Sequence, residues 1–201
     1  MKKIVFLYCM LFAIPLMAQD VTISLKKIKS VQQAKDFMKK NPDIQSEIIE
    51  INPIKDSSEI AKKLFSIQTD SIFLIENNYY KLVEVQPKIK HRVSYIYLSG
   101  VKLKKQTIDS LRTQIIQKYK QGTNFTNLVK EYNMDGNKNG DLGWFLGEWM
   151  VKGFAETIKK YKKGDIFIVN IPQQKWYYVV LKTFEDQKIE IKTYLKTIKP
   201  S

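Results

Sequence analysis

Cysteine and histidine are nearly absent from this chain of 201 residues, which has one of each, Cys9 and His91. Cys9 lies inside an apolar run at the N-terminus, in residues 4–17. No small-residue lipobox precedes Cys9, so we expect no lipidation there. If this run is removed, the mature chain has no cysteine, which excludes disulfides and thiolate catalysis.

Long hydrophobic runs are also absent after residue 17. Lys2 and Lys3 precede the apolar run, and the small residue Ala18 follows it. This pattern predicts a signal peptide over residues 1–18, cleaved before Gln19. The protein is then exported, to the periplasm if the cell has two membranes. A retained membrane anchor is the alternative, although the run is short for a membrane span.

Positive charge is in excess, with a formal net charge of +14 at pH 7. An excess of this size favours acidic partners or an acidic membrane surface. The lysines are spread over every segment, however, as on an ordinary solvated surface. No nucleic-acid-binding motif accompanies the charge, and no nucleic-acid partner is predicted.

Residues 19–88 show the pattern of a small α+β unit. Ser30 is placed to cap a helix over 31–40, and Asp56-Ser57-Ser58-Glu59 is placed to start a second helix. Alternation and apolar runs predict strands at 21–28, 47–51, 71–75 and 79–85. This unit contains neither a histidine nor a glycine-rich loop, so we predict no catalytic site in it.

Residues 89–186 form the second predicted domain, after a polar, basic boundary at 87–90. The expected order is a strand at 93–98, a helix capped by Thr107, a short helix at 125–132, a helix at 154–161, and strands at 165–171 and 176–182. We interpret residues 187–201 as a basic C-terminal tail.

A glycine-rich stretch lies in the middle of this domain. Gly140, Gly143 and Gly147 alternate with large apolar residues, so the backbone is expected to turn sharply. Such a stretch forms either a tight turn with buried apolar residues or a loop that presents them on a concave surface.

The order of these elements, from about Arg92 to Glu185, resembles the parvulin family of peptidyl-prolyl isomerases. The most specific matches are Gly140-Asp141-Leu142-Gly143-Trp144-Phe145, then Met150 and Phe154, and further on Lys163-Gly164-Asp165-Ile166 and Tyr177-Tyr178-Val179-Val180-Leu181-Lys182. The resemblance implies an α+β fold, in which helices wrap a small antiparallel sheet with a substrate groove on one face.

The resemblance also implies a set of site residues. An apolar pocket for the substrate proline ring would be formed by Leu142, Phe145, Met150 and Phe154. Asp135 stands where the family has a Cys or Asp. It would bias the electrostatics of the substrate amide, or else only hydrogen-bond its own loop. The reaction needs no covalent step, and neither a cofactor nor a metal is implied.

Two family histidines are replaced by tyrosine, at Tyr95 and Tyr178. Period-two alternation places Tyr95 with Val93 and Tyr97 on one face of its strand, and Tyr178 with Trp176 and Val180 on one face of the other. The resemblance implies that the two strands are neighbours with both rings on the same side beneath Asp135, so we predict that the two tyrosines approach each other. His91 matches neither family position, and we expect it to be exposed.

The implied function is peptidyl-prolyl isomerisation, acting on unfolded or folding exported proteins with X–Pro bonds. The alternative is a parvulin-fold chaperone or binding module with little isomerase activity. Separately, residues 58–85 echo residues 155–182 in their Lys-Lys pair, Ile-Phe pair and Tyr-Tyr pair. The first unit is therefore either a degenerate parvulin-like repeat or a chance similarity.

Overall fold

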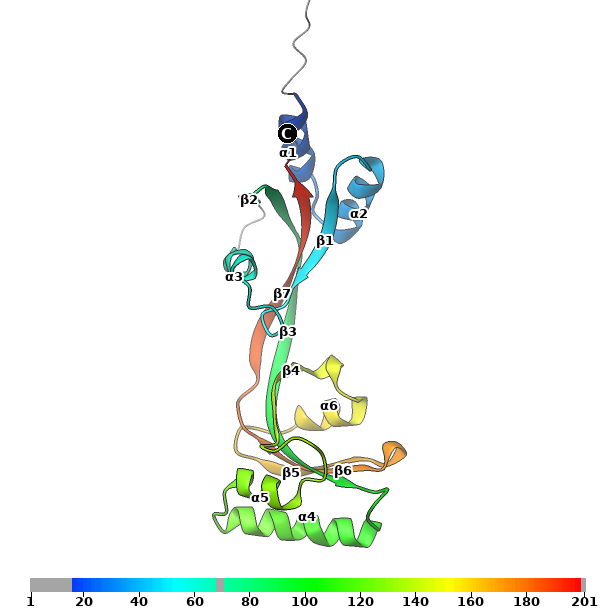
Figure 1. Cartoon of the computed structure of the whole chain (residues 1–201), viewed down its shortest axis with the longest axis vertical. Coiled ribbons are helices and arrows are strands. Elements are labelled where there is room, and N and C mark those ends of the chain that lie inside the picture. The colour runs from blue at the N-terminus through cyan, green and yellow to red at the C-terminus, as the bar shows by residue number, and fades with distance from the viewer. Residues whose placement is uncertain (1–15, 68–70, 200–201) are drawn as a thin grey trace, which may run out of the picture. The chain divides into compact units, whose positions relative to one another are not determined.

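The computed structural model of the protein describes residues 16–67 and 71–199 (Figure 1). The described chain divides into two units, one with residues up to Gln86 and from Glu190 onward, the other with Pro87–Ile189. Most of the predicted signal peptide, residues 1–15, lies outside the described residues. Within the described ranges, no helix is long and apolar enough to cross a membrane.

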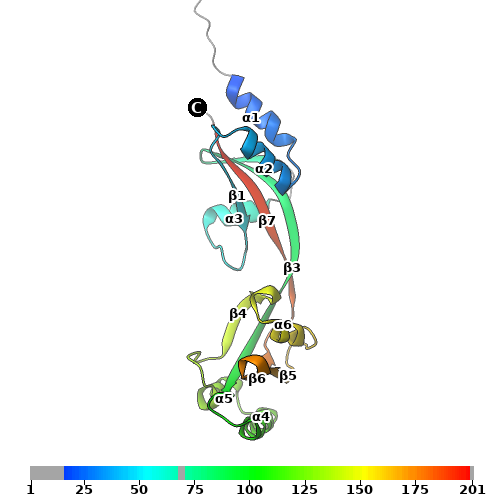
Figure 2. The same cartoon turned by 90° about the vertical axis from the view of Figure 1, so that its right-hand side faces the viewer.

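The first unit packs three helices on an antiparallel sheet (Figure 2). Its elements are α1 (Leu16–Lys26), α2 (Val31–Lys40), β1 (Ser46–Ile51), α3 (Glu59–Ser66), β2 (Ile72–Ile75), the first part of β3 (Asn78–Ser99) and most of β7 (Gln187–Ile198). Strand β1 pairs with β7, and β2 pairs with β3. Leu195 packs with α1 and α2, whereas its neighbour Tyr194 packs with α3. Successive residues of a strand point to opposite faces, so the two faces carry separate cores.

Helix α1 replaces the strand predicted at 21–28. Val21, Leu25 and Ile28 are buried and Ile23 is 47% exposed. The buried residues thus follow the helical spacing i, i+4, i+7 instead of alternation. Both periods fit so short an apolar pattern, and packing against α2 and β7 selects the helix.

The predicted basic tail is also wrong, since residues 187–198 form strand β7. Its lysines obscured the alternation, and one of them is buried: the Lys192 ammonium donates to the carbonyl oxygens of Phe65 (2.8 Å) and Ile67 (2.6 Å). A lysine in this place satisfies free carbonyls at the end of α3. The strand therefore belongs to the core of the first unit.

The second unit has the α+β architecture predicted from the sequence. Its elements are the rest of β3, α4 (Lys105–Lys120), α5 (Phe125–Tyr132), β4 (Asp141–Leu146), the 3₁₀ turn η1 (Gly147–Trp149), α6 (Lys152–Ile158), β5 (Ile166–Ile171), the 3₁₀ turn η2 (Pro172–Gln174) and β6 (Trp176–Lys182). The strands pair antiparallel in the order β4-β3-β6-β5.

Helices cover both faces of this second sheet. Ile96 and Val179 pack under α4 and α5, whereas Tyr95 and Val180 pack under α6. Tyr97 and Tyr178 are directly paired across β3 and β6 and pack in the same cluster as Tyr95, so the α6 face presents aromatic side chains from both central strands.

Several predicted boundaries shift. The strands predicted at 79–85 and 93–98 are one strand, β3, because residues 90–92 pair with β4. Helix α4 begins before Thr107, and its N-cap is Lys104 without a side-chain cap. Helix α6 starts and ends earlier than the predicted 154–161.

The two halves of the predicted repeat share an order of elements, α3-β2-β3 and α6-β5-β6. Their registers differ: Phe73 pairs with Tyr80, whereas Phe167 pairs with Val180. A duplicated origin therefore stays a prediction.

Gly140 lies where the loop before β4 approaches β3 most closely. Its φ is +71°, and the Tyr95 amide donates to its carbonyl oxygen over 2.9 Å. A Cβ at this position would lie 2.6 Å from the Tyr95 carbonyl oxygen and 2.7 Å from Val129 Cγ2. Glycine is thus required by both the backbone conformation and the space.

We expect Gly140→Ala to destabilise the second unit more than Gly143→Ala, its matched control. Gly143 also has a positive φ, +65°, but nothing lies within 4 Å of an added Cβ. The control should lose about 1–2 kcal/mol from left-handed strain alone, and Gly140→Ala should lose this plus the cost of the two collisions. Urea unfolding measures both, and equal losses would contradict the close approach.

Candidate functional site

A pocket of about 290 Å³ opens on the α6 face of the second unit. Its wall combines residues from β3, the loop after α5, β4, the segment from η1 to α6, and β6: Tyr95, Asp135, Leu142, Trp149, Met150, Val151, Phe154, Trp176 and Tyr178. The volume lies near the lower end of the range for small-ligand pockets. The wall is mainly apolar and aromatic, with one carboxylate, and we call this pocket the aromatic pocket.

The two tyrosines meet in this pocket, as predicted. Their ring centroids lie 5.9 Å apart in an edge-to-face arrangement. Tyr178 pairs with Tyr97 across the strands, so Tyr95 is its diagonal neighbour on the same face. The Tyr178 ring also contacts Phe154 edge-to-face, at 5.4 Å. The aromatic floor is therefore fixed by strand register.

Asp135 joins this floor to the loop after α5. The Tyr95 hydroxyl donates to Asp135 Oδ2 over 2.7 Å. The other oxygen, Oδ1, accepts from Asn133 Nδ2 (2.7 Å) and from the Asn137 amide (2.9 Å). Asn133 Oδ1 in turn accepts from the Tyr97 amide on β3 (2.7 Å). Asp135 thus hydrogen-bonds its own loop and also lines the pocket, and its effect on a substrate amide stays a prediction.

Both tyrosines are held in the neutral form. Burial, followed by the hydrogen bond to Asp135, raises the pKa of Tyr95 from 10.0 to about 12. Burial raises the pKa of Tyr178 further, and the neighbouring Tyr97 and Tyr95 add to the effect. Their hydroxyls are therefore protonated throughout the physiological pH range.

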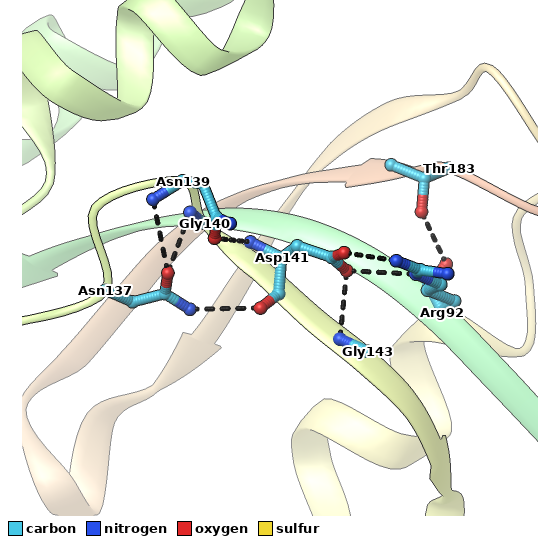
Figure 3. A network of polar contacts seen from close by, with 7 residues as sticks. All are labelled: Arg92, Asn137, Asn139, Gly140, Asp141, Gly143 and Thr183. Carbon is cyan, nitrogen blue, oxygen red and sulfur yellow. Dashed lines mark hydrogen bonds and ion pairs between the residues drawn. The ribbon is translucent and has the colours of Figure 1, made fainter.

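A network of amide and carboxylate groups shapes the glycine-rich loop (Figure 3). Asn137 Oδ1 accepts from the amides of Asn139 (3.3 Å) and Gly140 (3.0 Å), and its Nδ2 donates to the Asp141 carbonyl (3.1 Å). This arrangement fixes the start of β4, and with it the position of Leu142 in the pocket wall.

The Asp141 carboxylate completes the network. It accepts two hydrogen bonds from the Arg92 guanidinium, at 3.1 and 2.5 Å, and one from the Gly143 amide at 2.9 Å (Figure 3). The hydrogen bonding to Arg92 is the main reason why the pKa of Asp141 lies below its usual value. Asp141 therefore remains charged and anchors the start of β4 to β3.

Three of the four predicted apolar residues line the pocket: Leu142, Met150 and Phe154. Phe145 does not. It is 2% exposed, and its ring lies beside His91 with the centroids 6.0 Å apart. Phe145 and Leu142 belong to the same apolar cluster as Phe154, but Phe145 is fully buried in it, whereas Leu142 is partly exposed and reaches the pocket.

Sequence reasoning missed Trp149, Val151 and Trp176. Alternation places Trp176 on the face of β6 that carries Tyr178, but alternation alone does not indicate a place in the pocket wall. Trp149 and Val151 reach the pocket through the conformation of η1 and the turn into α6, which the sequence pattern does not indicate.

The prediction that His91 is exposed is wrong. Its side chain is 2% exposed, and its Nδ1 lies 2.7 Å from Asp186 Oδ1. The buried Lys182 ammonium contacts the same carboxylate. His91 is buried because β3 continues through it and pairs it with Phe145 of β4. It does not line the aromatic pocket.

Comparison with known proteins identifies the domain. The family model described as the PPIC-type PPIASE domain matches residues 77–187. The foldase protein PrsA of Bacillus subtilis is 34% identical over 88 residues, which cover 40% of this chain and 30% of that protein. PrsA of Geobacillus kaustophilus is 34% identical over 107 residues, covering 51% of this chain and 34% of that protein.

Among solved structures, the peptidylprolyl isomerase PrsA from Bacillus anthracis aligns with a TM-score of 0.41 at 20% identity, over 84% of this chain and 70% of that chain. The alignments to the two curated PrsA proteins span about a third of their length. The family match covers more than half of this chain, including every residue of the aromatic pocket. The chain therefore belongs to the PpiC-type, or parvulin, family of peptidyl-prolyl isomerase domains.

Proposed function

We propose that this protein is a peptidyl-prolyl cis-trans isomerase that assists the folding of exported proteins. The observation that carries the proposal is the aromatic pocket with the Asp135 carboxylate at its edge, hydrogen-bonded to Tyr95. The pocket is apolar and small enough for a proline ring. X–Pro bonds are suitable substrates because their cis and trans forms are close in energy.

The reaction rotates a peptide bond against a barrier of about 18–20 kcal/mol, which originates in amide resonance. Resonance places negative charge on the carbonyl oxygen and double-bond character on the C–N bond. A carboxylate near that oxygen disfavours this charge distribution, and the twisted amide feels the repulsion less. Asp135 would therefore lower the barrier by electrostatics alone.

The pocket wall supplies the second requirement, a fixed proline ring. Leu142, Met150 and Phe154 would hold the ring while the preceding carbonyl turns. The neutral Tyr178 hydroxyl, in the same pocket, is a donor available to the amide nitrogen, which becomes an acceptor as it twists. In this mechanism Tyr95 positions Asp135, and neither residue changes its protonation state.

Export to the periplasm or cell surface is part of the proposal. It is supported by the N-terminal sequence, in which two lysines precede the apolar run of residues 4–17 and Ala18 follows it. A mature protein lighter by residues 1–18 would establish cleavage, and retention of Met1 would contradict it.

The alternative is a chaperone or binding module that keeps the pocket with little isomerase activity. The two tyrosines at the positions of the family histidines favour it. An assay on the protein itself separates the two functions, because a binding module would hold X–Pro peptides without accelerating their isomerisation.

We expect Asp135→Asn to lower kcat/KM for a short X–Pro peptide by about tenfold, which corresponds to about 1.4 kcal/mol of transition-state stabilisation. The asparagine retains an acceptor for Asn133 and Asn137 but removes the charge. Tyr95→Phe should also lower kcat/KM, because it frees the carboxylate from its position.

The matched control is Asp165→Asn, an exposed aspartate that accepts from the Lys162 amide (2.8 Å) outside the pocket. Its kcat/KM should equal that of the wild type. Exchange spectroscopy by NMR measures the rates directly. The isomerase proposal is contradicted if the wild-type protein does not accelerate the isomerisation. The role assigned to Asp135 is contradicted if the Asp135→Asn variant keeps full activity.

Activity should be nearly flat between about pH 6 and 8, because both pocket tyrosines titrate far above this range. Since folding raises the pKa of Tyr95 to about 12, its contribution to stability is complete below pH 10 and is lost as the pH rises toward that value. Alkaline unfolding curves should show this loss.

The double variant Tyr95→His/Tyr178→His provides the contrast. It restores the family pattern, and its imidazoles should introduce a pH dependence near neutrality. Its activity should rise if the loss of histidine limits catalysis. A wild-type profile that already follows an ionisation between pH 6 and 8 would contradict neutral tyrosines as the floor of the site.

A further inference from the structure

A second and larger pocket, of about 920 Å³, lies within the second unit on another side of the η1–α6 segment. It is lined by Pro87, Lys88, Ile89, His91, Leu146, Gly147, Glu148, Met150, Lys152, Ala155, Glu156, Lys159, Asp186 and Lys188. Met150 also lines the aromatic pocket, so the two pockets share one side chain. We call this second pocket the lysine pocket.

The interior of the lysine pocket is a fixed polar and apolar surface. His91 is 2% exposed, and its Nδ1 is held by Asp186. The other ring nitrogen of His91, Nε2, lies close to Gly147, since a Cβ placed on this glycine would be 3.8 Å from it. Leu146 and Ala155 are buried beside them, and Ile89 is 51% exposed. A ligand would therefore meet apolar surface around one buried imidazole.

The charge around this surface is not balanced. Asp186 is already engaged by the buried Lys182 ammonium, which also donates to the Ile158 carbonyl at the end of α6 (3.4 Å). Lys88 is paired with Glu148 at 2.8 Å. Lys152 and Glu156 are 3.9 Å apart and both well exposed, which makes them a weak pair.

Lys159 and Lys188 remain. Neither has an ion-pair partner among the residues that the structure describes. The lysine pocket thus combines an apolar interior with two uncompensated cationic side chains. This is the complement of a peptide segment in which acidic and apolar residues alternate.

We propose that the lysine pocket binds an acidic, apolar segment of the polypeptide whose X–Pro bond occupies the aromatic pocket. The inference rests on the proposed function, because it assigns this segment to the same client. Two contacts on one chain raise the effective concentration of the proline at the catalytic pocket. Clients with an acidic and apolar stretch near a proline are then selected over others.

The test uses the full chain and a short, fluorescently labelled, proline-free peptide of alternating glutamate and leucine. Fluorescence anisotropy should show saturable binding that weakens as salt is added. The double variant Lys159→Glu/Lys188→Glu should bind at least about tenfold more weakly, because two attractions become repulsions. A peptide with lysine in place of glutamate should not bind to the wild type.

The matched control is Lys160→Glu/Lys163→Glu, which makes the same change of net charge at two exposed lysines outside the pocket. It should retain nearly all of the binding. Both variants should isomerise a short uncharged X–Pro peptide at the wild-type rate, because none of these lysines lines the aromatic pocket.

Equal binding by the two double variants would overturn the proposal, as would absence of binding to wild-type protein that isomerises the short peptide normally. Binding of phosphatidylglycerol vesicles that the pocket double variant loses, without any binding of the acidic peptide, would also overturn it, in favour of a membrane contact. If acidic peptide binding follows the pocket lysines but the short peptide is not isomerised, the isomerase proposal fails and the lysine pocket remains a peptide site.

Discussion

The hydrogen bond between the Tyr95 hydroxyl and Asp135 is the contact on which the aromatic pocket depends. It joins a central strand, β3, to the loop after α5, and the Asn133 and Asn137 groups lock the same carboxylate from the other side. The Asn137 side chain also hydrogen-bonds the Gly140 amide and the Asp141 carbonyl, so the same network fixes the start of β4. One carboxylate therefore sets both the charge at the pocket edge and the position of its apolar wall.

Burial and charge act in the same direction here. The carboxylate beside Tyr95 and the low polarity of the floor both disfavour ionised tyrosine. Because the Tyr95 hydroxyl keeps its proton, it continues to donate its hydrogen bond to the Asp135 carboxylate. The family histidines would titrate in the range where these tyrosines do not, so neither tyrosine changes its charge across physiological pH.

Strand periodicity made much of this pocket predictable. Alternation along 93–97 and 176–180, together with the family resemblance that makes these strands neighbours, predicts that Tyr95 and Tyr178 meet on one face, and the edge-to-face contact confirms it. The second helix of the domain was predicted at 125–132, where α5 lies. These predictions succeeded because each depends on a local repeat that tertiary packing did not override.

The errors have a common physical origin in tertiary contacts. Lys192 appeared to belong to a solvated tail, but the carbonyls at the end of α3 bury it. His91 appeared to precede a strand, but β4 extends that strand and covers it. The Asn133 and Asn137 bonds depend on loop conformations that no period encodes. Phe145 is implied as a pocket residue by the family resemblance, but it is buried in the apolar cluster that it shares with Phe154 and does not line the pocket.

The most direct test of this mechanism is a crystal structure of the protein with a short X–Pro peptide bound. We expect the proline ring between Leu142, Met150 and Phe154, with the preceding carbonyl oxygen directed toward Asp135. A proline ring bound outside the aromatic pocket, or a carbonyl oxygen directed away from Asp135, would contradict the mechanism.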